Sequence, residues 1–405
     1  MVKQKANPKL MKEINEEIIV DLLKKKEPLS RAEIAKLTGL SRATVSSIVN
    51  RLVDTGLIKE IGVGKSKSNG GRKPVLLELN PEAFYIVGVD LGTNNIIAIV
   101  TDLKARIKGK VSIPTEVYKG LSGVLENLEY AISEVISISG VKKTKIIGMG
   151  MAVAGLIDTS NGEVIFSPNF SWSNVPIKKL VEERLNIPTY IDNCTRVMAL
   201  GEITFGNARG RENLLYINVG YGVGSAIVIG GKVYPNISEI GHIPVVEDGP
   251  KCGCGKRGCL EAVSSGSAIE TRAKEILESG KPTLISELVD RQKDKVTAKI
   301  VAKAAENGDQ IAIEIFNNSG WYLGKGIATA VNLLSPELVV IGGGVSQAGE
   351  ILFQPVRKGF EHYAMEDLAR NVKIIPSGLG LDAGVIGAIA LVLKNTMAGP
   401  MIVIP

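Results

Sequence analysis

The sequence predicts a mixed α/β protein with a separate helical module at its N-terminus. After residue 83, apolar strand-like segments and glycine-rich turns alternate with helical segments, which is typical of α/β architecture. Before residue 56, three helical patterns follow one another. Residues 1–75 contain 16 Lys and Arg against 8 Asp and Glu, whereas the net charge of the whole chain is +6. We therefore expect an N-terminal module that binds a polyanion, joined to a near-neutral body.

Start and stop signals define the three N-terminal helices. The first is expected over about residues 8–26. The second follows the N-cap Ser30, with Glu33 in capping-box spacing, and stops at Gly39. The third runs from Ser41 to about residue 54 and stops before Gly56. The side chains expected to face inward are Ile14, Ile18, Ile19, Leu22 and Leu23 in the first helix, Ile34 and Leu37 in the second, and Val45, Ile48, Val49 and Leu52 in the third.

A basic, glycine-rich segment follows these helices, between short strands expected at 57–60 and 75–79. The combination is typical of a winged helix-turn-helix, which binds DNA. Arginines and short polar side chains of the third helix can reach base edges and phosphates, and cations of the wing can contact phosphates. A small helical domain with a solvated basic face would leave the wing unexplained. The predicted DNA-binding residues are Ser30, Arg31, Ser41, Arg42, Thr44, Ser47, Asn50, Arg51, Lys65, Lys67, Arg72 and Lys73.

Three of the four cysteines and one of the two histidines lie in the stretch GHIPVVEDGPKCGCGKRGCLE, residues 241–261. Three thiolates and an imidazole are a standard tetrahedral ligand set for structural Zn²⁺. The glycines between the cysteines let the backbone bend around an ion. Unrelated free thiols or a disulfide are the alternatives, but one disulfide would leave a third cysteine unexplained. The predicted zinc ligands are His242, Cys252, Cys254 and Cys259.

Membrane and secreted classes are disfavoured. No apolar run reaches the roughly 18 residues that a bilayer span requires, and the N-terminus lacks the apolar core of a secretory signal. Few cysteines, mostly in one cluster, suit a reducing interior. We therefore expect a cytoplasmic protein with no membrane partner.

The whole chain resembles the ROK family (repressors, open reading frames, kinases), and within it the XylR/NagC/Mlc-like repressors. The matching segments of the body are DLGTNN, AVAGLID, SPNFSW, IDNCTRVMALGE, GYGVGSAIVIGGKVY, EIGH and CGCGKRGCLE. The resemblance implies a two-lobed, actin-like body of the ribonuclease H-like or sugar-kinase type. It implies a DNA-binding domain over residues 1–80, a first lobe over 83–195 and 383–405, and a second lobe over 196–382 that carries the zinc loop.

The same resemblance implies a closed cleft that binds a sugar. Its contacts would be Asn169, Asn193, Glu239, His242 and Glu261. Carboxylates and amides accept and donate hydrogen bonds in fixed directions, as recognition of sugar hydroxyls requires. Asparagines are also common in turns, which is the plain alternative for Asn169 and Asn193.

Three positions depart from the pattern of ROK kinases. Those kinases place an Asp directly after the Asn of the IDNC segment as general base, and this chain has Cys194 there. Asn94 follows the first phosphate turn, and Tyr221 stands where a small hydroxyl residue is usual. Loss of a positioned general base typically costs about 10²–10⁴-fold in rate. The body is therefore expected to be catalytically silent.

These observations predict a sugar-responsive repressor of carbohydrate-utilisation genes that binds double-stranded operator DNA. The effector is expected to be a small sugar, xylose or glucose-like, and the loss of the Asp at position 194 favours a pentose such as xylose. We expect a homodimer or homotetramer, since a dimer presents two recognition helices to a two-fold operator. Two alternatives stay open: an ATP-dependent ROK sugar kinase fused to a DNA-binding domain, and a metal or redox sensor built on the cysteine loop.

Overall fold

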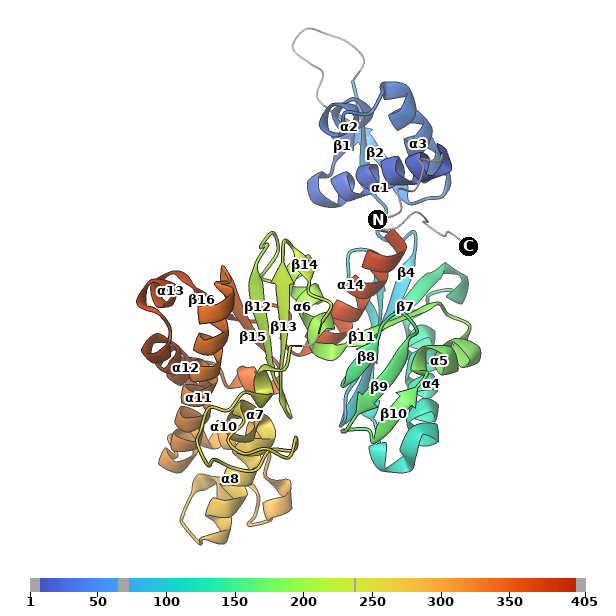
Figure 1. Cartoon of the computed structure of the whole chain (residues 1–405). Helices are drawn as coiled ribbons and strands as arrows, with labels where there is room; N and C mark the ends of the chain where they lie inside the picture. Colours follow the sequence, from blue (N-terminus) through green and yellow to red (C-terminus); the bar gives the residue numbers. More distant parts are fainter. Residues whose placement is uncertain (1–7, 65–72, 237, 398–405) are drawn as a thin grey trace. The chain divides into compact units, whose positions relative to one another are not determined.

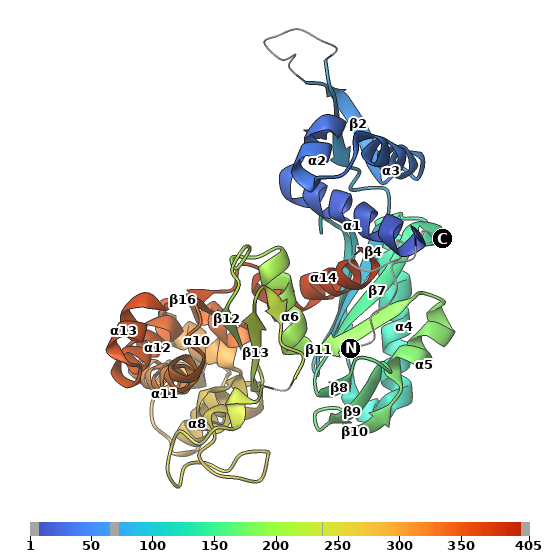
Figure 2. The same cartoon turned by 45° about the horizontal axis from the view of Figure 1, so that its top comes forward.

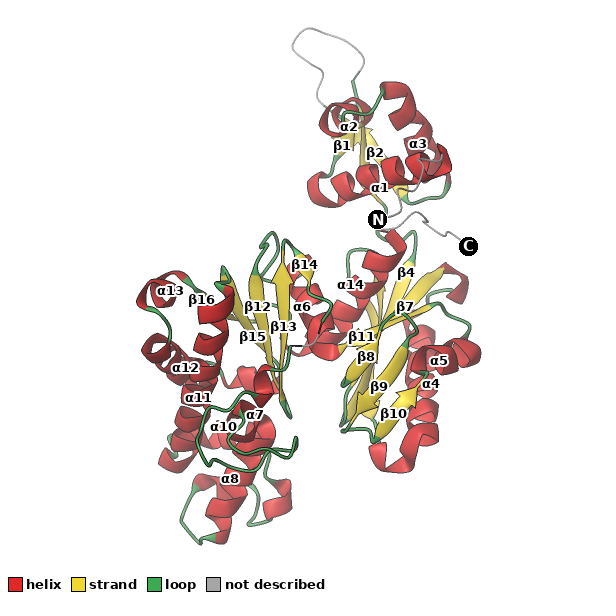
Figure 3. Cartoon of the chain, in the orientation of Figure 1, coloured by secondary structure: helices red, strands yellow, loops and turns green. Residues whose placement is uncertain are grey.

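A computed structural model describes residues 8–64, 73–236 and 238–397 of the chain (Figure 1). The chain forms two compact units, one of residues 1–192 and 388–405 and the other of residues 193–387. It passes from one unit to the other at residues 192–193 and again at 387–388, inside helix α14 (Ala383–Met397). Helices accompany a mixed sheet in each unit, as Figure 3 shows, which confirms the predicted α/β class.

The N-terminal segment forms a winged helix-turn-helix with the three helices and two wing strands expected from the sequence, and with one further strand between the first two helices. Its helices are α1 (Pro8–Lys26), α2 (Arg31–Thr38) and α3 (Arg42–Asp54), and its strands are β1 (Leu29–Ser30), β2 (Ile58–Val63) and β3 (Val75–Leu79). Strand β3 pairs antiparallel with both β1 and β2. Ser30 and Glu33 form the predicted capping box, and Gly39 ends α2 with a φ of +72°. Local signals thus set these helix ends correctly.

The core of this domain confirms part of the predicted inward face. Helix α3 buries all four expected residues. The prediction was wrong for Ile14, Ile18 and Leu37, whose side chains are 39%, 40% and 50% exposed. Helix α1 instead buries a stripe of Glu16, Ile19, Val20 and Leu23. These buried residues keep helical spacing, but one of them, Glu16, carries a carboxylate. A search for apolar residues at helical spacing therefore does not find the complete buried face.

The rest of the first unit is built on a five-stranded sheet of order β11-β7-β4-β5-β6. These strands are β4 (Tyr85–Leu91), β5 (Asn95–Asp102), β6 (Ile107–Pro114), β7 (Ile146–Val153) and β11 (Thr189–Asn193). Strand β4 pairs antiparallel with β5 and parallel with β7. A smaller sheet joins β8 (Leu156–Asp158), β9 (Glu163–Ser167) and β10 (Trp172–Val175).

Helices α4 (Gly120–Ser139) and α5 (Ile177–Leu185) cover one face of this sheet (Figures 1 and 2). Helix α4 contacts β5 and β6, and its buried Leu128, Ile132 and Val135 share one apolar core with the central strands. The latter part of α14 packs tightly on β7, because a Cβ at Gly150 would lie 1.9 Å from the carbonyl oxygen of Ala388. Glycine is therefore required at that crossing.

The second unit contains a five-stranded sheet of order β14-β13-β12-β15-β16. Its strands are β12 (Leu214–Val219), β13 (Val223–Ile229), β14 (Lys232–Val233), β15 (Leu338–Gly342) and β16 (Lys373–Pro376). Its helices, besides the start of α14, are α6 (Cys194–Thr204), α7 (Leu260–Ser264), α8 (Gly266–Glu278), α9 (Leu284–Leu288), α10 (Ala298–Glu306), α11 (Gln310–Leu334), α12 (Glu350–Tyr363) and α13 (Glu366–Asn371). Helices α11 and α12 lie side by side (Figures 1 and 2).

Within the described ranges, no helix is both long and apolar enough to cross a membrane.

Candidate functional site

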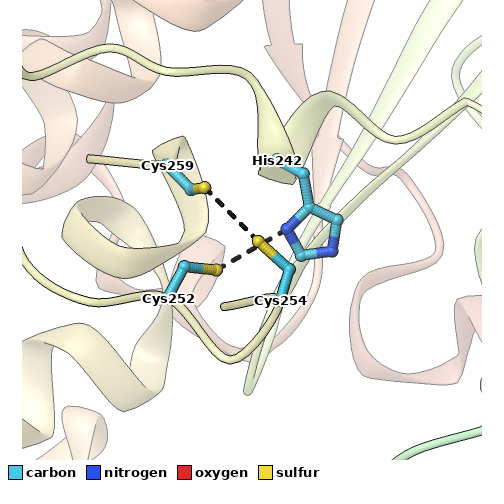
Figure 4. Close-up of side chains that lie close together, drawn as sticks. All are labelled: His242, Cys252, Cys254 and Cys259. Atoms are coloured by element: carbon cyan, nitrogen blue, oxygen red, sulfur yellow. Dashed lines mark hydrogen bonds between the residues drawn. The ribbon is translucent and has the colours of Figure 1, made fainter. Parts of the chain in front are cut away.

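Four side chains of the second unit converge on one point (Figure 4). His242 ends the short 3₁₀ helix Ile240–His242, and Cys259 is the N-cap residue of α7. Cys252 and Cys254 come from the loop between these elements. Their ligand atoms all lie within 4.8 Å of one another. The structure therefore brings together all four predicted zinc ligands.

The spacing of these atoms fits a tetrahedral metal ion. The Cys254 and Cys259 sulfurs are 3.7 Å apart, and the Cys252 sulfur is 3.6 Å from Nδ1 of His242. An ion about 2.3 Å from each sulfur requires tetrahedral edges of about 3.7 Å. None of the four cysteines, all of them in the described part of the chain, forms a disulfide, which needs sulfurs about 2 Å apart. This cluster could hold a metal ion, and a disulfide is excluded in this conformation.

Backbone geometry fixes the loop around the cluster. The amide of Cys252 donates to the carbonyl of Lys256 at 2.8 Å, which closes a tight turn. Gly258 has a φ of +71°, and a Cβ there would lie 1.8 Å from the carbonyl oxygen of Val246. The loop thus requires glycine at this position both for its dihedral angle and for space.

Electrostatics also favour a cation at the cluster. Burial raises the pKa of the Cys259 thiol to about 12, with neighbouring cysteines adding to the rise. Burial also raises the pKa of Cys252. A bound divalent cation deprotonates such thiols and compensates the buried negative charge.

Two carboxylates flank the cluster. Glu239 directly precedes the 3₁₀ helix, and its carbonyl accepts a hydrogen bond from the His242 amide at 3.1 Å. Desolvation raises the pKa of the Glu239 carboxyl; the nearby His242 opposes the rise and Glu261 adds to it. Glu261 lies in the first turn of α7, with Oε1 4.0 Å from the Cys252 sulfur. Its Oε2 accepts a hydrogen bond from the Val223 amide at 3.0 Å. Glu261 is therefore already tied to the start of β13.

The two predicted asparagines lie in different units. Asn193 is the N-cap of α6, and its side-chain oxygen accepts from the amides of Thr195 and Arg196 at 2.9 and 3.3 Å. Cys194 is the first residue of α6, half-buried, with its sulfur 3.9 Å from Oγ1 of Thr195. Asn169 is exposed and belongs to the other unit. Helix capping thus gives Asn193 a local role.

The turn between β12 and β13 has features that the sequence did not indicate. The amide of Gly220 donates to the carbonyl of Gly222, and Gly266 and Ser267 at the start of α8 donate to the carbonyls of Gly220 and Tyr221. The Tyr221 side chain is 62% exposed. In the first phosphate-turn motif, the Gly92 amide donates to the carbonyl of Asn95 at 3.1 Å.

Residues of the winged helix divide into exposed and internally bonded groups. Arg42, Ser47 and Asn50 of α3 are exposed. Arg51 instead forms an ion pair with the buried Glu16 of α1, and Arg31 pairs with Glu60 at 3.3 Å.

Helix capping engages two of the three predicted serines. Ser30 is buried in the capping box, and Ser41 caps α3 by accepting the Thr44 amide at 3.1 Å. Lys73 is exposed, and the predicted wing residues Lys65, Lys67 and Arg72 lie outside the described residues.

Sequence comparison matches the two parts of the chain to two family models. The model for winged helix-turn-helix DNA-binding domains matches residues 13–59, and the ROK family model matches residues 86–395. The chain belongs to the ROK family. Its two-part organisation is thus a DNA-binding winged helix followed by a ROK body.

Relatives and solved structures that cover most of this chain agree with its assignment to the ROK family. It is 31% identical to the xylose repressor of Caldicellulosiruptor bescii, over 98% of this chain and 99% of that one. It resembles the crystal structure of a ROK family transcriptional regulator, a homologue of the E. coli MLC protein, with a TM-score of 0.81 and 26% identity over 96% of this chain and 97% of that one. It also resembles a ROK glucokinase from Streptomyces griseus, with a TM-score of 0.69 and 31% identity over 76% of this chain and 98% of that one.

Proposed function

We propose that this protein is a sugar-responsive, DNA-binding repressor of carbohydrate-utilisation genes. The observation that carries the proposal is the union, in one chain, of a winged helix-turn-helix with a ROK body. This chain is similar to a xylose repressor over 98% of its length. We propose to divide the chain into a DNA-binding domain (1–80), a first lobe (83–195 with 383–405) and a second lobe with the zinc loop (196–382). A regulator that binds operator DNA works in the cytoplasm.

Helix α3 is the proposed recognition helix. Its exposed Arg42, Ser47 and Asn50 offer the donors and acceptors that read base edges in a major groove. The exposed Lys73 and the wing cations Lys65, Lys67 and Arg72 would contact phosphates. Ser30 and Arg51 are better explained by their contacts within the domain. Two copies of the domain, in a homodimer or homotetramer, would match a two-fold operator.

Xylose is the proposed effector. Glu239, His242 and Glu261 lie on or beside one metal cluster and provide acceptors and a donor for sugar hydroxyls. Asn193 and Asn169 join the set by resemblance to the family. Two observations support a pentose as the effector. The relative from Caldicellulosiruptor bescii is named a xylose repressor, and Cys194 stands in the place of a carboxylate.

Structural Zn²⁺ is the proposed metal. Three sulfurs and one imidazole nitrogen at tetrahedral spacing suit Zn²⁺ and leave no position open for a catalytic water. Its proposed role is to hold the loop that carries Glu239, His242 and Glu261.

We propose that the body does not phosphorylate its sugar. By resemblance to ROK kinases, Cys194 stands in the place of the Asp that serves as general base, and a thiol accepts hydrogen bonds only weakly. In the second phosphate turn, the amides of Gly220 and Val223 already donate within the protein, whereas phosphate-binding turns direct such amides at the ligand. In a coupled ADP-release assay with a sugar panel, we expect no turnover above background; ATP-dependent release would favour the fused kinase instead.

Fluorescence anisotropy with a duplex selected from a random-sequence library tests the proposal. Titration with mono- and disaccharides should reveal one sugar, expected to be D-xylose, that weakens DNA binding by about 5- to 150-fold. If no sugar changes DNA affinity while zinc or an oxidant does, the cysteine loop is a metal or redox sensor and the proposal fails.

A further inference from the structure

The first three residues of β13, Val223–Ser225, contact every segment of the second unit that carries a proposed sugar-binding residue. Val223 receives two of these contacts. Its amide donates to Oε2 of Glu261 at 3.0 Å. Its carbonyl lies against Gly241, where a Cβ would come within 2.2 Å of the oxygen. The elements that carry Glu261 and His242 therefore meet at one residue.

Gly224 lies against the start of α6. A Cβ at Gly224 would lie 2.5 Å from Oγ1 of Thr195, so the strand and the helix approach closely. The amide of Thr195 in turn donates to the side chain of Asn193 at 2.9 Å. Asn193 and Cys194 thus take their position from the same short stretch of strand.

Ser225 completes the contacts of this stretch. Its side chain is buried, at 5% exposure, and its hydroxyl donates to the carbonyl of Ser238 at 2.9 Å. The same oxygen is 2.6 Å from the Ser238 hydroxyl and receives a long hydrogen bond, 3.5 Å, from the Ile240 amide. One hydroxyl therefore bonds to the residues on both sides of Glu239.

We propose that Ser225 is a positioning residue for effector binding, which rests on the function proposed above. In the segment between β14 and the 3₁₀ helix, the described residues 234–236 and 238–239 belong to no helix or strand. A buried hydroxyl that bonds on both sides of Glu239 therefore fixes the direction of that residue. Ser225 acts through Glu239 and His242 and does not touch the sugar. The start of β13 thus positions the proposed sugar-binding residues of the second unit relative to one another.

Calorimetry of the full chain with D-xylose, comparing wild type with Ser225→Ala, tests the proposal. The substitution leaves the Ser238 carbonyl and the Ile240 amide without their partner, and we expect xylose binding to weaken about tenfold or more. DNA affinity without sugar should be unchanged. Ser346→Ala is the matched control, because Ser346 is also 5% exposed and also donates to a backbone carbonyl, that of Gly343 at 2.7 Å. It should bind xylose as wild type does. Equal xylose affinity in Ser225→Ala and wild type would overturn the proposal.

Hydrogen exchange provides a readout that does not depend on sugar. Peptides covering residues 238–243 should exchange faster in Ser225→Ala than in Ser346→Ala, at the same bound zinc content. If wild type binds no sugar, the proposed function fails. If peptides covering residues 238–243 exchange equally fast in Ser225→Ala and Ser346→Ala, the proposal that Ser225 positions Glu239 is overturned. If Ser225→Ala does not fold, Ser238→Ala, which removes only the hydroxyl–hydroxyl contact, takes its place. It should weaken xylose binding about threefold, and wild-type affinity in that variant would contradict the proposal.

Discussion

At the residue scale, side chains whose partners are near in the sequence could be predicted better than side chains whose partners are far away in the sequence. The capping box of Ser30 and Glu33 could be predicted from the sequence because its members are three residues apart. The ion pair of Arg51 with Glu16 could not, because nothing in the sequence places α1 beside α3. A charged residue on an apolar stripe was consequently missed, and Ile14 and Ile18 were wrongly placed inside.

Arg42 and Arg51 should respond differently to substitution by alanine. Arg42→Ala should weaken operator binding and leave stability unchanged, since Arg42 is exposed on α3, the proposed recognition helix. Arg51→Ala leaves the buried Glu16 carboxylate unpaired and should cost about 1 kcal/mol of stability, a value reduced by the partial exposure of Arg51. Urea unfolding and DNA anisotropy on both variants separate the two effects. Equal stability of Arg51→Ala and wild type would show that the pair does not hold α1 and α3 together.

At the element scale, the cysteine loop was predicted closely because its ligands are near one another in sequence and have few competitors in the chain. The tie between this loop and β13 could not be predicted. Ser225 and Glu261 look like ordinary strand and helix residues until the fold brings Glu261 to the amide of Val223 and Ser225 to the carbonyl of Ser238. The bounds of α2 and α3 followed from caps and glycines. The strand predicted at 57–60 instead extends over Ile58–Val63, and register between distant segments requires the structure.

Cys259→Ser and Cys194→Ser form a matched pair for the metal centre. Cys259→Ser removes one of four ligands, so bound zinc should fall well below one equivalent and the second unit should lose thermal stability. Cys194 lies outside the cluster, and Cys194→Ser should retain its zinc. Elemental analysis after dialysis, together with thermal unfolding, measures both. Full zinc occupancy in Cys259→Ser would contradict the four-ligand site.

At the scale of the whole molecule, the function depends on coupling between a DNA-binding domain and a sugar-binding body. A sugar releases DNA only if it binds the DNA-free state more tightly than the DNA-bound state. Thermodynamic linkage makes the effect reciprocal, so operator DNA must weaken sugar binding by the same factor. The family and fold could be predicted from the sequence, since the motifs occur in order along the whole chain.

Calorimetric titration of D-xylose into the full chain, with and without saturating operator duplex, tests this coupling most directly. We expect xylose to bind about 5- to 150-fold more weakly in the presence of the duplex, by the same factor with which xylose weakens DNA binding. Equal xylose affinity with and without DNA would contradict it.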